Sequence, residues 1–316
     1  MGRYRELDLS KITRTSIGAR RSKVSAGLLS RPCRPEGRLA DFFKTWPRIL
    51  KAADLLVLAD DIVRARRRGR PVILMMGAHP IKCGLSPVII DLLEHGLITA
   101  LATNGAGAIH DFEMACWGKT SEDVARGLED GSFGMARETA DLINGAITQG
   151  DARDLGCGES LGLFLTESEP PYLKHSLLAA CYRLGVPATI HIAVGTDIIH
   201  QHPTFDGAAA GRASHRDFRI LAAVVSKLGR GVVINLGSTV ILPEVFLKAL
   251  TVARNLGHGV RNFTAANFDM IQHYRPNVNV VSRPVAGGGR GLTFTGHHEI
   301  MLPLLAAAVK ARARIG

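Results

Sequence analysis

The sequence predicts an α/β fold, with a doubly wound, mostly parallel sheet of the Rossmann-like type. Short apolar runs, which are typical of buried parallel strands, alternate with helical patterns roughly every thirty to forty residues. Small or polar residues follow several of these runs, at the positions where open α/β sheets bind ligands. Neither a linker nor an internal repeat divides the chain after its first segment, so one domain is expected over residues 37–316.

Residues 1–36 are polar and basic, and Gly27, Pro32 and Pro35 interrupt them. We interpret this segment as an N-terminal arm that would become ordered against a partner subunit. Residues 39–68 have helical periodicity with a break near Pro47, so two helices are expected there.

The stretch 71–113 contains the most informative unit. It begins with the apolar run Val72–Met76, predicted to be a strand ending at Gly77, and continues through a turn to a helix between Ser86 and Gly96. A second strand over residues 97–102 leads into Thr103-Asn104-Gly105-Ala106-Gly107 and then into the polar pair His110-Asp111. This order predicts a strand–helix–strand unit with small residues after each strand.

The remaining chain continues the alternation. Helices are expected at 121–125, 135–147, 171–184, 217–228, 243–253 and 297–313, strands at 187–195, 231–236, 260–263 and 278–281, and loops or flexible segments at 150–158, 205–211 and 287–289.

The net charge of +11 raises nucleic acid as a partner, but the pattern argues against it. The basic excess is concentrated in residues 3–23, 64–70 and 310–314, and aromatic residues make up only 5%, too few for a base-stacking platform. The sequence has no apolar run long enough for a membrane span and no convincing secretory signal. Its five scattered cysteines fit reduced thiols, so a cytoplasmic protein is expected.

Three predicted strand ends carry small residues that would let backbone N–H groups approach a phosphate: residues 77–84, 103–107 and 237–239. The alternative is that these residues only form tight turns. For His110-Asp111, a proton-transferring pair and a helix cap with an incidental histidine are both compatible with the pattern.

Two histidine clusters raise the question of a metal. They are His200-x-His202, with Asp197 and Asp206 nearby, and His297-His298-Glu299. Neither has a defined ligand spacing such as that of HExxH, so no metal site is predicted.

Several segments resemble deoxyhypusine synthase, in the same order. They are Gly84 to Asp111, Pro187 to Asp197, Val232 to Thr239, Asn262 to Asp269 (NFTAANFD) and Ile300 to Leu305 (IMLPLL). The resemblance covers about residues 70 to 310. It implies an NAD-binding fold and a homotetramer with sites at its interfaces.

The resemblance also implies site residues. Thr103, Asp197, Thr264, Ala265 and Asp269 would contact NAD, with Gly84, Asn104, Gly105, Gly237 and Ser238 in the matched cofactor segments. His79, Lys82 and His297 lie in matched pocket segments and would contact substrate or cofactor.

The departures concern the chemistry. The synthase family has a catalytic lysine in a Trp-Gly-Lys motif, where this chain has Val281-Ser282-Arg283-Pro284, and its His-His pair is replaced by Pro243-Glu244. Arginine stays protonated and cannot act as the amine nucleophile, so butylamine transfer is not expected. Around His110-Asp111 the chain is similar to the NAD-dependent ornithine cyclodeaminase-type domain, which has a Gly-rich turn followed by His-Asp-x-Glu and acts on a free amino acid.

Together these features predict an NAD-dependent enzyme that acts on a small amine or amino acid through an imine. His110 is the expected general acid/base and Asp111 would orient it, while Glu244, Asp197 or Asp269 would bind the substrate ammonium. The alternatives are a NAD-binding or scaffold relative without catalysis and a metal-dependent enzyme.

Overall fold

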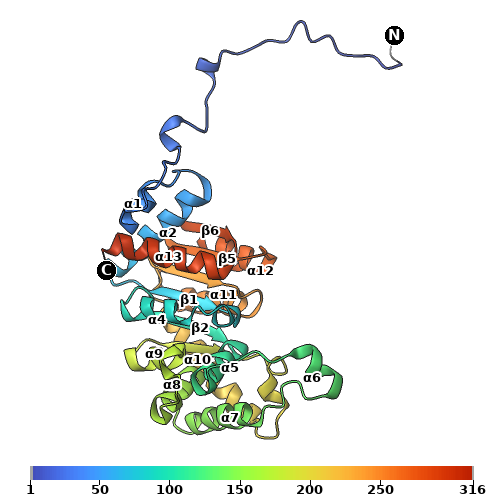
Figure 1. Cartoon of the computed structure of the whole chain (residues 1–316), viewed down its shortest axis with the longest axis vertical. Coiled ribbons are helices and arrows are strands. Elements are labelled where there is room, and N and C mark those ends of the chain that lie inside the picture. The colour runs from blue at the N-terminus through green and yellow to red at the C-terminus, as the bar shows by residue number, and fades with distance from the viewer. Residues whose placement is uncertain (1–2, 315–316) are drawn as a thin grey trace.

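The computed structural model describes residues 3–314, and its centre is a six-stranded sheet between helices (Figure 1). The strands are β1 (Val72–Met76), β2 (Ala100–Asn104), β3 (Ala188–His191), β4 (Val232–Leu236), β5 (Phe263–Asp269) and β6 (Gly289–Thr295). Their order is β3-β2-β1-β4-β5-β6 and every neighbouring pair is parallel. The predicted doubly wound α/β fold is therefore confirmed.

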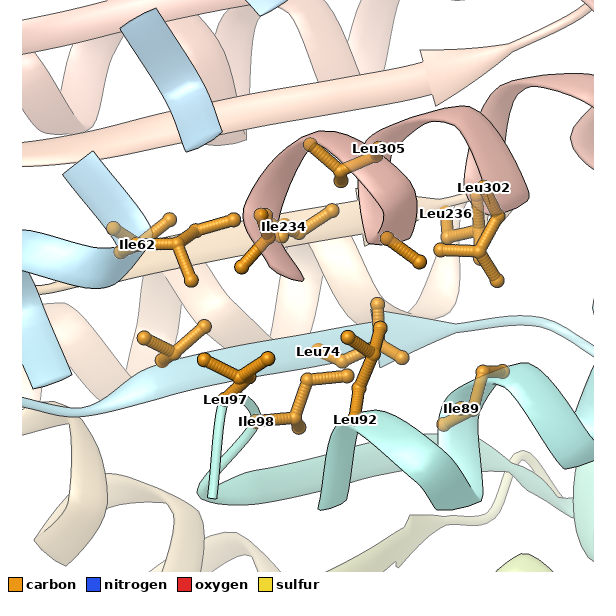
Figure 2. Packing of buried hydrophobic residues seen from close by; sticks show 14 of the residues in the cluster. Ile62, Leu74, Ile89, Leu92, Leu97, Ile98, Ile234, Leu236, Leu302 and Leu305 are labelled. Atoms are coloured by element: carbon orange, nitrogen blue, oxygen red, sulfur yellow. The ribbon is translucent and has the colours of Figure 1, made fainter. Parts of the chain in front are cut away.

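Alternate side chains of the central strands enter two different cores. Leu74 of β1 and Ile234 of β4 pack with α2 (Leu50–Arg67), α4 (Ser86–Glu94) and α13 (His298–Ala313), as Figure 2 shows. Ile73 and Val233, one residue earlier in each strand, pack on the opposite face with α10 (Gly207–Val225) and α11 (Ile241–Asn255). Burial on both faces explains why these strands read as continuous apolar runs.

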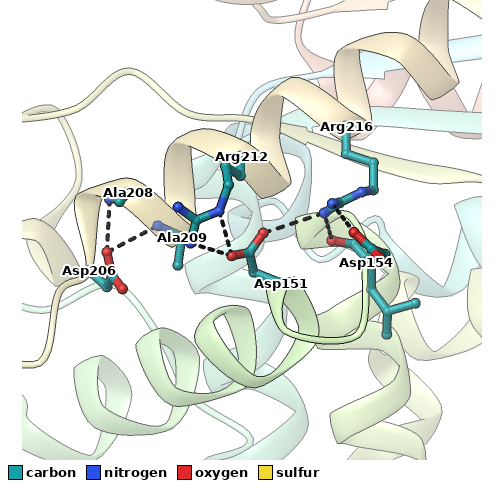
Figure 3. A network of polar contacts seen from close by, with 8 residues as sticks. Asp151, Asp154, Asp206, Ala208, Ala209, Arg212 and Arg216 are labelled. Atoms are coloured by element: carbon teal, nitrogen blue, oxygen red, sulfur yellow. Dashed lines mark hydrogen bonds and ion pairs between the residues drawn. The ribbon is translucent and has the colours of Figure 1, made fainter.

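A third core lies beside the β3 edge of the sheet. It joins α5 (Gly105–Trp117), α7 (Arg137–Asp151), α8 (Cys157–Ser168) and α9 (Leu177–Leu184) to α10. Polar contacts fasten the same helices: Asp151 at the end of α7 pairs with Arg212 (2.6 Å) and Arg216 (3.5 Å) of α10, and Arg216 also pairs with Asp154 (2.8 Å) (Figure 3). The short helices α3 (His79–Lys82), α6 (Val124–Asp130) and α12 (Tyr274–Pro276) connect the larger elements.

The first described segment, residues 3–36, runs away from the domain and contains only two short 3₁₀ turns, Ile17–Ala19 and Ala26–Leu28 (Figure 1). Nearly all its side chains are exposed, including large apolar ones such as Leu7, Leu9 and Ile17. The helix α1 (Leu39–Lys44) follows it. The domain boundary at residue 36 stays a prediction.

Several expected elements were wrong. Residues 278–281 belong to a π-helix (Asn277–Ser282) rather than a strand, and the strand expected at 260–263 forms later, as β5. The expected loop at 287–289 leads directly into β6, an edge strand whose sequence, GRGLTFT, is too rich in glycine to predict a strand. The expected loop at 150–158 contains the start of α8, and the expected flexible segment at 205–211 contains the start of α10.

No helix of residues 3–314 is both long and apolar enough to cross a membrane. All five cysteines are free thiols.

Candidate functional site

The carboxyl ends of the strands form the candidate site. The strand order reverses between β1 and β4, and ligands of open α/β sheets bind at such a switch point. Gly77 follows β1 and Gly237 follows β4, and their backbones lie so close that a Cβ on Gly77 would be 3.1 Å from the Gly237 carbonyl oxygen. Gly237 has a positive φ of 68°, and a side chain there would collide with the ring of His298. Gly237 therefore requires glycine, and a side chain at Gly77 would force the Gly237 carbonyl group to shift.

The amino terminus of α5 lies at the end of β2. The Asn104 side chain caps the helix by accepting the Gly107 N–H at 3.0 Å. A Cβ on Gly105 would overlap the carboxylate of Asp197, and one on Gly107 would overlap the hydroxyl of Thr103. The two glycines thus let the first turn of α5 pack directly on these polar side chains.

Thr103 and Asp197 keep unused hydrogen-bonding atoms at this helix end. The Thr103 Oγ1 and Asp197 Oδ2 atoms are buried and have no hydrogen-bond partner among residues 3–314, although Nε2 of His200 lies 3.8 Å from Asp197 Oδ2. Burial raises the pKa of Asp197 to about 6, although hydrogen bonds from the Ala106 backbone and the Thr196 side chain oppose the shift.

A pocket of about 280 Å³ opens beside this helix end. Its titratable side chains are those of Lys82 of α3, His110 and Glu113 of α5, Glu122 of the loop before α6, and Asp197 of the loop after β3. Its other lining residues are Ala106, Ile109, Ser121, Val124, Phe133, Ala136, Thr196 and Ile198. The pocket combines one ammonium, three carboxylates and one imidazole in a volume suited to a small polar molecule.

His110 is held on one side only. Its Nδ1 atom lies 2.5 Å from the Thr120 hydroxyl, which in turn donates to Glu113 at 2.5 Å. Burial, with a smaller contribution from Lys82, lowers the pKa of His110 to about 4, so the ring is neutral at pH 7. A neutral imidazole that lines a pocket can accept a proton.

Asp111 does not orient His110, contrary to the prediction. Its buried carboxylate points away, to the start of α9, where it accepts hydrogen bonds from the Ser176 hydroxyl (2.6 Å) and the backbone N–H groups of Leu177 (2.7 Å) and Leu178 (3.1 Å). Burial raises its pKa to about 6 against these hydrogen bonds. The cap interpretation therefore describes Asp111, although it caps α9 and not its own helix.

Thr264 and Ala265 do not join the site either. They lie at the amino end of β5, level with Val232 and Val233, whereas the site is at the other end of the sheet. The Thr264 hydroxyl donates to Asp61 of α2 at 2.7 Å, and Ala265 is buried in the core. The two ends of a strand of this length lie roughly 20 Å apart. Residues at the amino end of β5 therefore cannot reach a site at its carboxyl end, although the resemblance covers the whole strand.

Asp269, at the carboxyl end of β5, does lie in the site region. Its Oδ2 atom is buried without a partner among the described residues, and so is Nδ1 of His298, the first residue of α13. The His298 ring packs against that of His79 at 5.4 Å. Burial lowers the pKa of His298, while the Phe268 carbonyl and Asp269 oppose the shift.

The other predicted site residues make separate contacts. Ser238 accepts the Leu242 N–H at 3.2 Å, and Gly84, with φ of 73°, follows α3. His297 is exposed and lies 3.8 Å from Glu299. Glu244 does not line the pocket. Its carboxylate accepts a hydrogen bond from the Asn279 side chain (2.8 Å) and pairs with Lys248 and Arg275.

The sequence reasoning missed three residues as site residues. Glu113 is the last residue of the His-Asp-x-Glu pattern, and His298 was noted only as a metal candidate. Thr120 comes from a loop and carried no pattern.

The histidine clusters do not assemble a metal site in the part of the chain that the structure describes, where no group of three or more ligating side chains converges. His200 Nδ1 accepts the Gly195 N–H at 3.0 Å, and His202 Nε2 lies 2.8 Å from the Gly134 carbonyl oxygen.

The strand ends also carry residues that could hold a dinucleotide. Thr103, Asp197 and Asp269 each have a buried polar atom without a hydrogen-bond partner among the described residues. These three residues could hold NAD, whereas Gly77 and Gly237 are filled on their side-chain side by protein atoms.

No family model and no curated protein sequence matches this chain. Among solved structures, it is similar to the complex of AgrE with ornithine and NAD⁺ (14% identity, TM-score 0.52), over 82% of this chain and 33% of that one. It is also similar to a conserved LOR/SDH-type protein from Methanococcus maripaludis S2 (16% identity, TM-score 0.50), over 88% of this chain and 71% of that one. A deoxyhypusine synthase-type protein from Entamoeba histolytica matches at 10% identity and a TM-score of 0.48, over 87% and 94%. The chain spans about a third of the length of AgrE, and at these identities the likeness shows the fold alone.

Proposed function

We propose that the protein is a NAD-dependent enzyme that oxidises the amine-bearing carbon of a small amine or amino acid, through an imine of the substrate. One observation carries this proposal: a neutral His110 lines a small pocket together with Lys82 and Asp197, beside strand ends where Thr103 and Asp269 keep buried polar atoms without hydrogen-bond partners. NAD supplies the hydride acceptor in such chemistry, and the protein supplies position and proton transfer.

The polar groups of the pocket suit an amino acid. Lys82 would bind a carboxylate, Asp197 would bind the ammonium group, and His110 would take the proton that the ammonium loses before oxidation. The structure of AgrE holds ornithine and NAD⁺, which makes ornithine the first compound to test.

The protein is not proposed to be a deoxyhypusine synthase. The position of the family lysine falls in the segment 281–284, where Arg283 donates to Asn279 at 3.2 Å, and an arginine offers no amine nucleophile. The competing function is a NAD-binding scaffold in which catalysis has been lost with that lysine.

We also propose a cytoplasmic homo-oligomer, a tetramer by the family resemblance. The exposed apolar side chains of residues 3–36 support association, because a solitary chain would leave them in water. Light scattering on the purified protein would give the mass, and a monomer at micromolar concentration would contradict the proposal.

The test compares two histidine variants. We expect His110→Ala to lower turnover of the substrate by at least about 100-fold, because it removes the base, and to leave NAD binding nearly unchanged. The matched control is His258→Ala, at an exposed loop position, which should keep both. Calorimetry measures NAD binding, and NADH absorbance with product analysis measures turnover of ornithine, putrescine and spermidine.

The outcomes separate the two functions. Binding of NAD without turnover of any amine would favour the scaffold. Turnover that survives in His110→Ala would place the base elsewhere.

A further inference from the structure

The side chains that hold His110 form a chain of three groups across two helices and a loop. Glu113 lies one turn after His110 on α5, Thr120 comes from the loop that follows, and Thr139 comes from α7. Glu113 accepts from Thr120 through Oε2 (2.5 Å) and from Thr139 through Oε1 (3.0 Å). Both oxygens of the carboxylate are therefore fixed by hydroxyl groups.

The proton count of Thr120 settles the direction of the chain. A threonine hydroxyl has a single proton, which here goes to Glu113. Its oxygen can then only accept from His110 Nδ1, 2.5 Å away. In a neutral ring the other nitrogen, Nε2, must then be without a proton. The side-chain hydrogen bond that His110 makes among residues 3–314 runs through Nδ1, which leaves Nε2 free to accept a proton.

We propose that Glu113 and Thr120 are positioning residues, which hold His110 in the Nδ1–H tautomer and keep Nε2 as the proton acceptor in the pocket. The catalytic part of this inference rests on the proposed function, whereas the tautomer does not. A glutamate reaching histidine through a threonine thus has the orienting role that Asp111 does not have.

The proton transfer involves Nε2 alone, and no proton moves between His110, Thr120 and Glu113. Nε2 accepts a proton from the substrate ammonium, and Nδ1 keeps its own proton and continues to donate to Thr120. The imidazolium that forms lies 4.0 Å from the Glu113 carboxylate, which stabilises its charge. Nε2 returns the same proton in a later step.

Other charged groups line the same pocket and would shape a pH profile. They are Lys82 of α3, Asp197 of the loop after β3 and Glu122 of the loop before α6. Substitutions at Thr120 leave all three in place, so a change in the profile would report on the hydrogen-bonded chain.

The first test needs neither substrate nor cofactor. In protein with ¹⁵N-labelled histidine, long-range ¹H–¹⁵N spectra at pH 7 distinguish the tautomers, and the His110 signals are identified by their loss in His110→Gln. We expect the Nδ1–H form in the wild type and in Thr120→Ser, which keeps the hydroxyl. In Thr120→Val we expect a shift toward the Nε2–H form, with the fold checked by circular dichroism. An Nε2–H ring in the wild type, or the same tautomer in Thr120→Val, would overturn the proposal.

The second test uses turnover once a substrate is known. Thr120→Val should lower kcat by roughly 10- to 100-fold with little change in KM, and Thr120→Ser should restore it. An equal loss in both variants would mean that the loop needs threonine only for packing, and would contradict a positioning role. If no amine is turned over at all, the proposed function is contradicted. The tautomer of His110 is still decided by the first test, which needs no substrate.

Discussion

Asp217 shows how a single buried carboxylate can join three elements. It lies on α10 with no exposed surface, and its Oδ2 atom accepts the backbone N–H groups of Gly158 of α8 (3.0 Å) and Ile190 of β3 (2.8 Å). Burial raises its pKa to about 7 in spite of these hydrogen bonds. Asp111 and Asp217 are thus acidic residues that join elements of the fold, and neither lines the candidate pocket.

The raised pKa predicts how stability depends on pH. The folded protein keeps the Asp217 proton up to about pH 7, while the unfolded chain loses it near pH 4. The folded state binds more protons between these values, so this group contributes less stability as the pH rises from about 4 to about 7.

We therefore expect Asp217→Asn to gain stability relative to the wild type as the pH rises, by about 4 kcal/mol between pH 4 and pH 8. The asparagine oxygen can accept both N–H groups and does not ionise. Urea unfolding of the two proteins at several pH values measures the difference. A difference that is constant with pH would show that Asp217 titrates normally.

At the scale of elements, the first turn of α5 is the feature on which the site depends. Gly105 and Gly107 allow it to pack on Asp197 and Thr103. Gly145, in the middle of α7, faces open space instead.

This contrast predicts opposite effects of one substitution. Gly105→Ala should destabilise the protein by about 1–3 kcal/mol, because the new Cβ overlaps the Asp197 carboxylate. Gly145→Ala should stabilise it by about 0.5–1 kcal/mol, because alanine is the better helix former. Thermal unfolding tests both, and a neutral Gly105→Ala would mean that Asp197 moves freely.

Some helices and strands could be predicted from the sequence and others could not. Strands β1 and β4 and helix α13 were predicted because apolar periodicity and small residues mark them. The glycine-rich β6 lacks that pattern: Gly291 stands where a Cβ would overlap the Val281 carbonyl oxygen, so contact with the π-helix dictates the residue. Tertiary packing decides such segments, and local periodicity does not.

The same limit holds for the site. His110, Lys82, Thr103 and Asp197 could be proposed from the sequence, and the structure brings them to one end of the sheet. The hydrogen-bond partner of His110 could not be proposed from the sequence, because the conformation of a loop brings Thr120 to the ring. Asp111 is adjacent to His110 in sequence but points to a different side of the helix, since successive helical residues diverge.

At the scale of the whole molecule, the parallel sheet has two different ends. Small residues and unpartnered polar atoms gather at the carboxyl end. At the amino end, Asp61 of α2 already pairs with Thr264, Arg64 and Arg290. NAD is proposed to bind at the carboxyl end, and two threonines, one at each end of the sheet, allow this site to be tested.

The most direct measurement is calorimetric titration of NAD⁺ into the wild type, Thr103→Val and Thr264→Val. Each variant loses one hydroxyl group with little change in shape. We predict that Thr103→Val weakens NAD⁺ binding about fivefold, the loss of one hydrogen bond, while Thr264→Val binds like the wild type. No binding to the wild type, or a loss of affinity confined to Thr264→Val, would contradict the account.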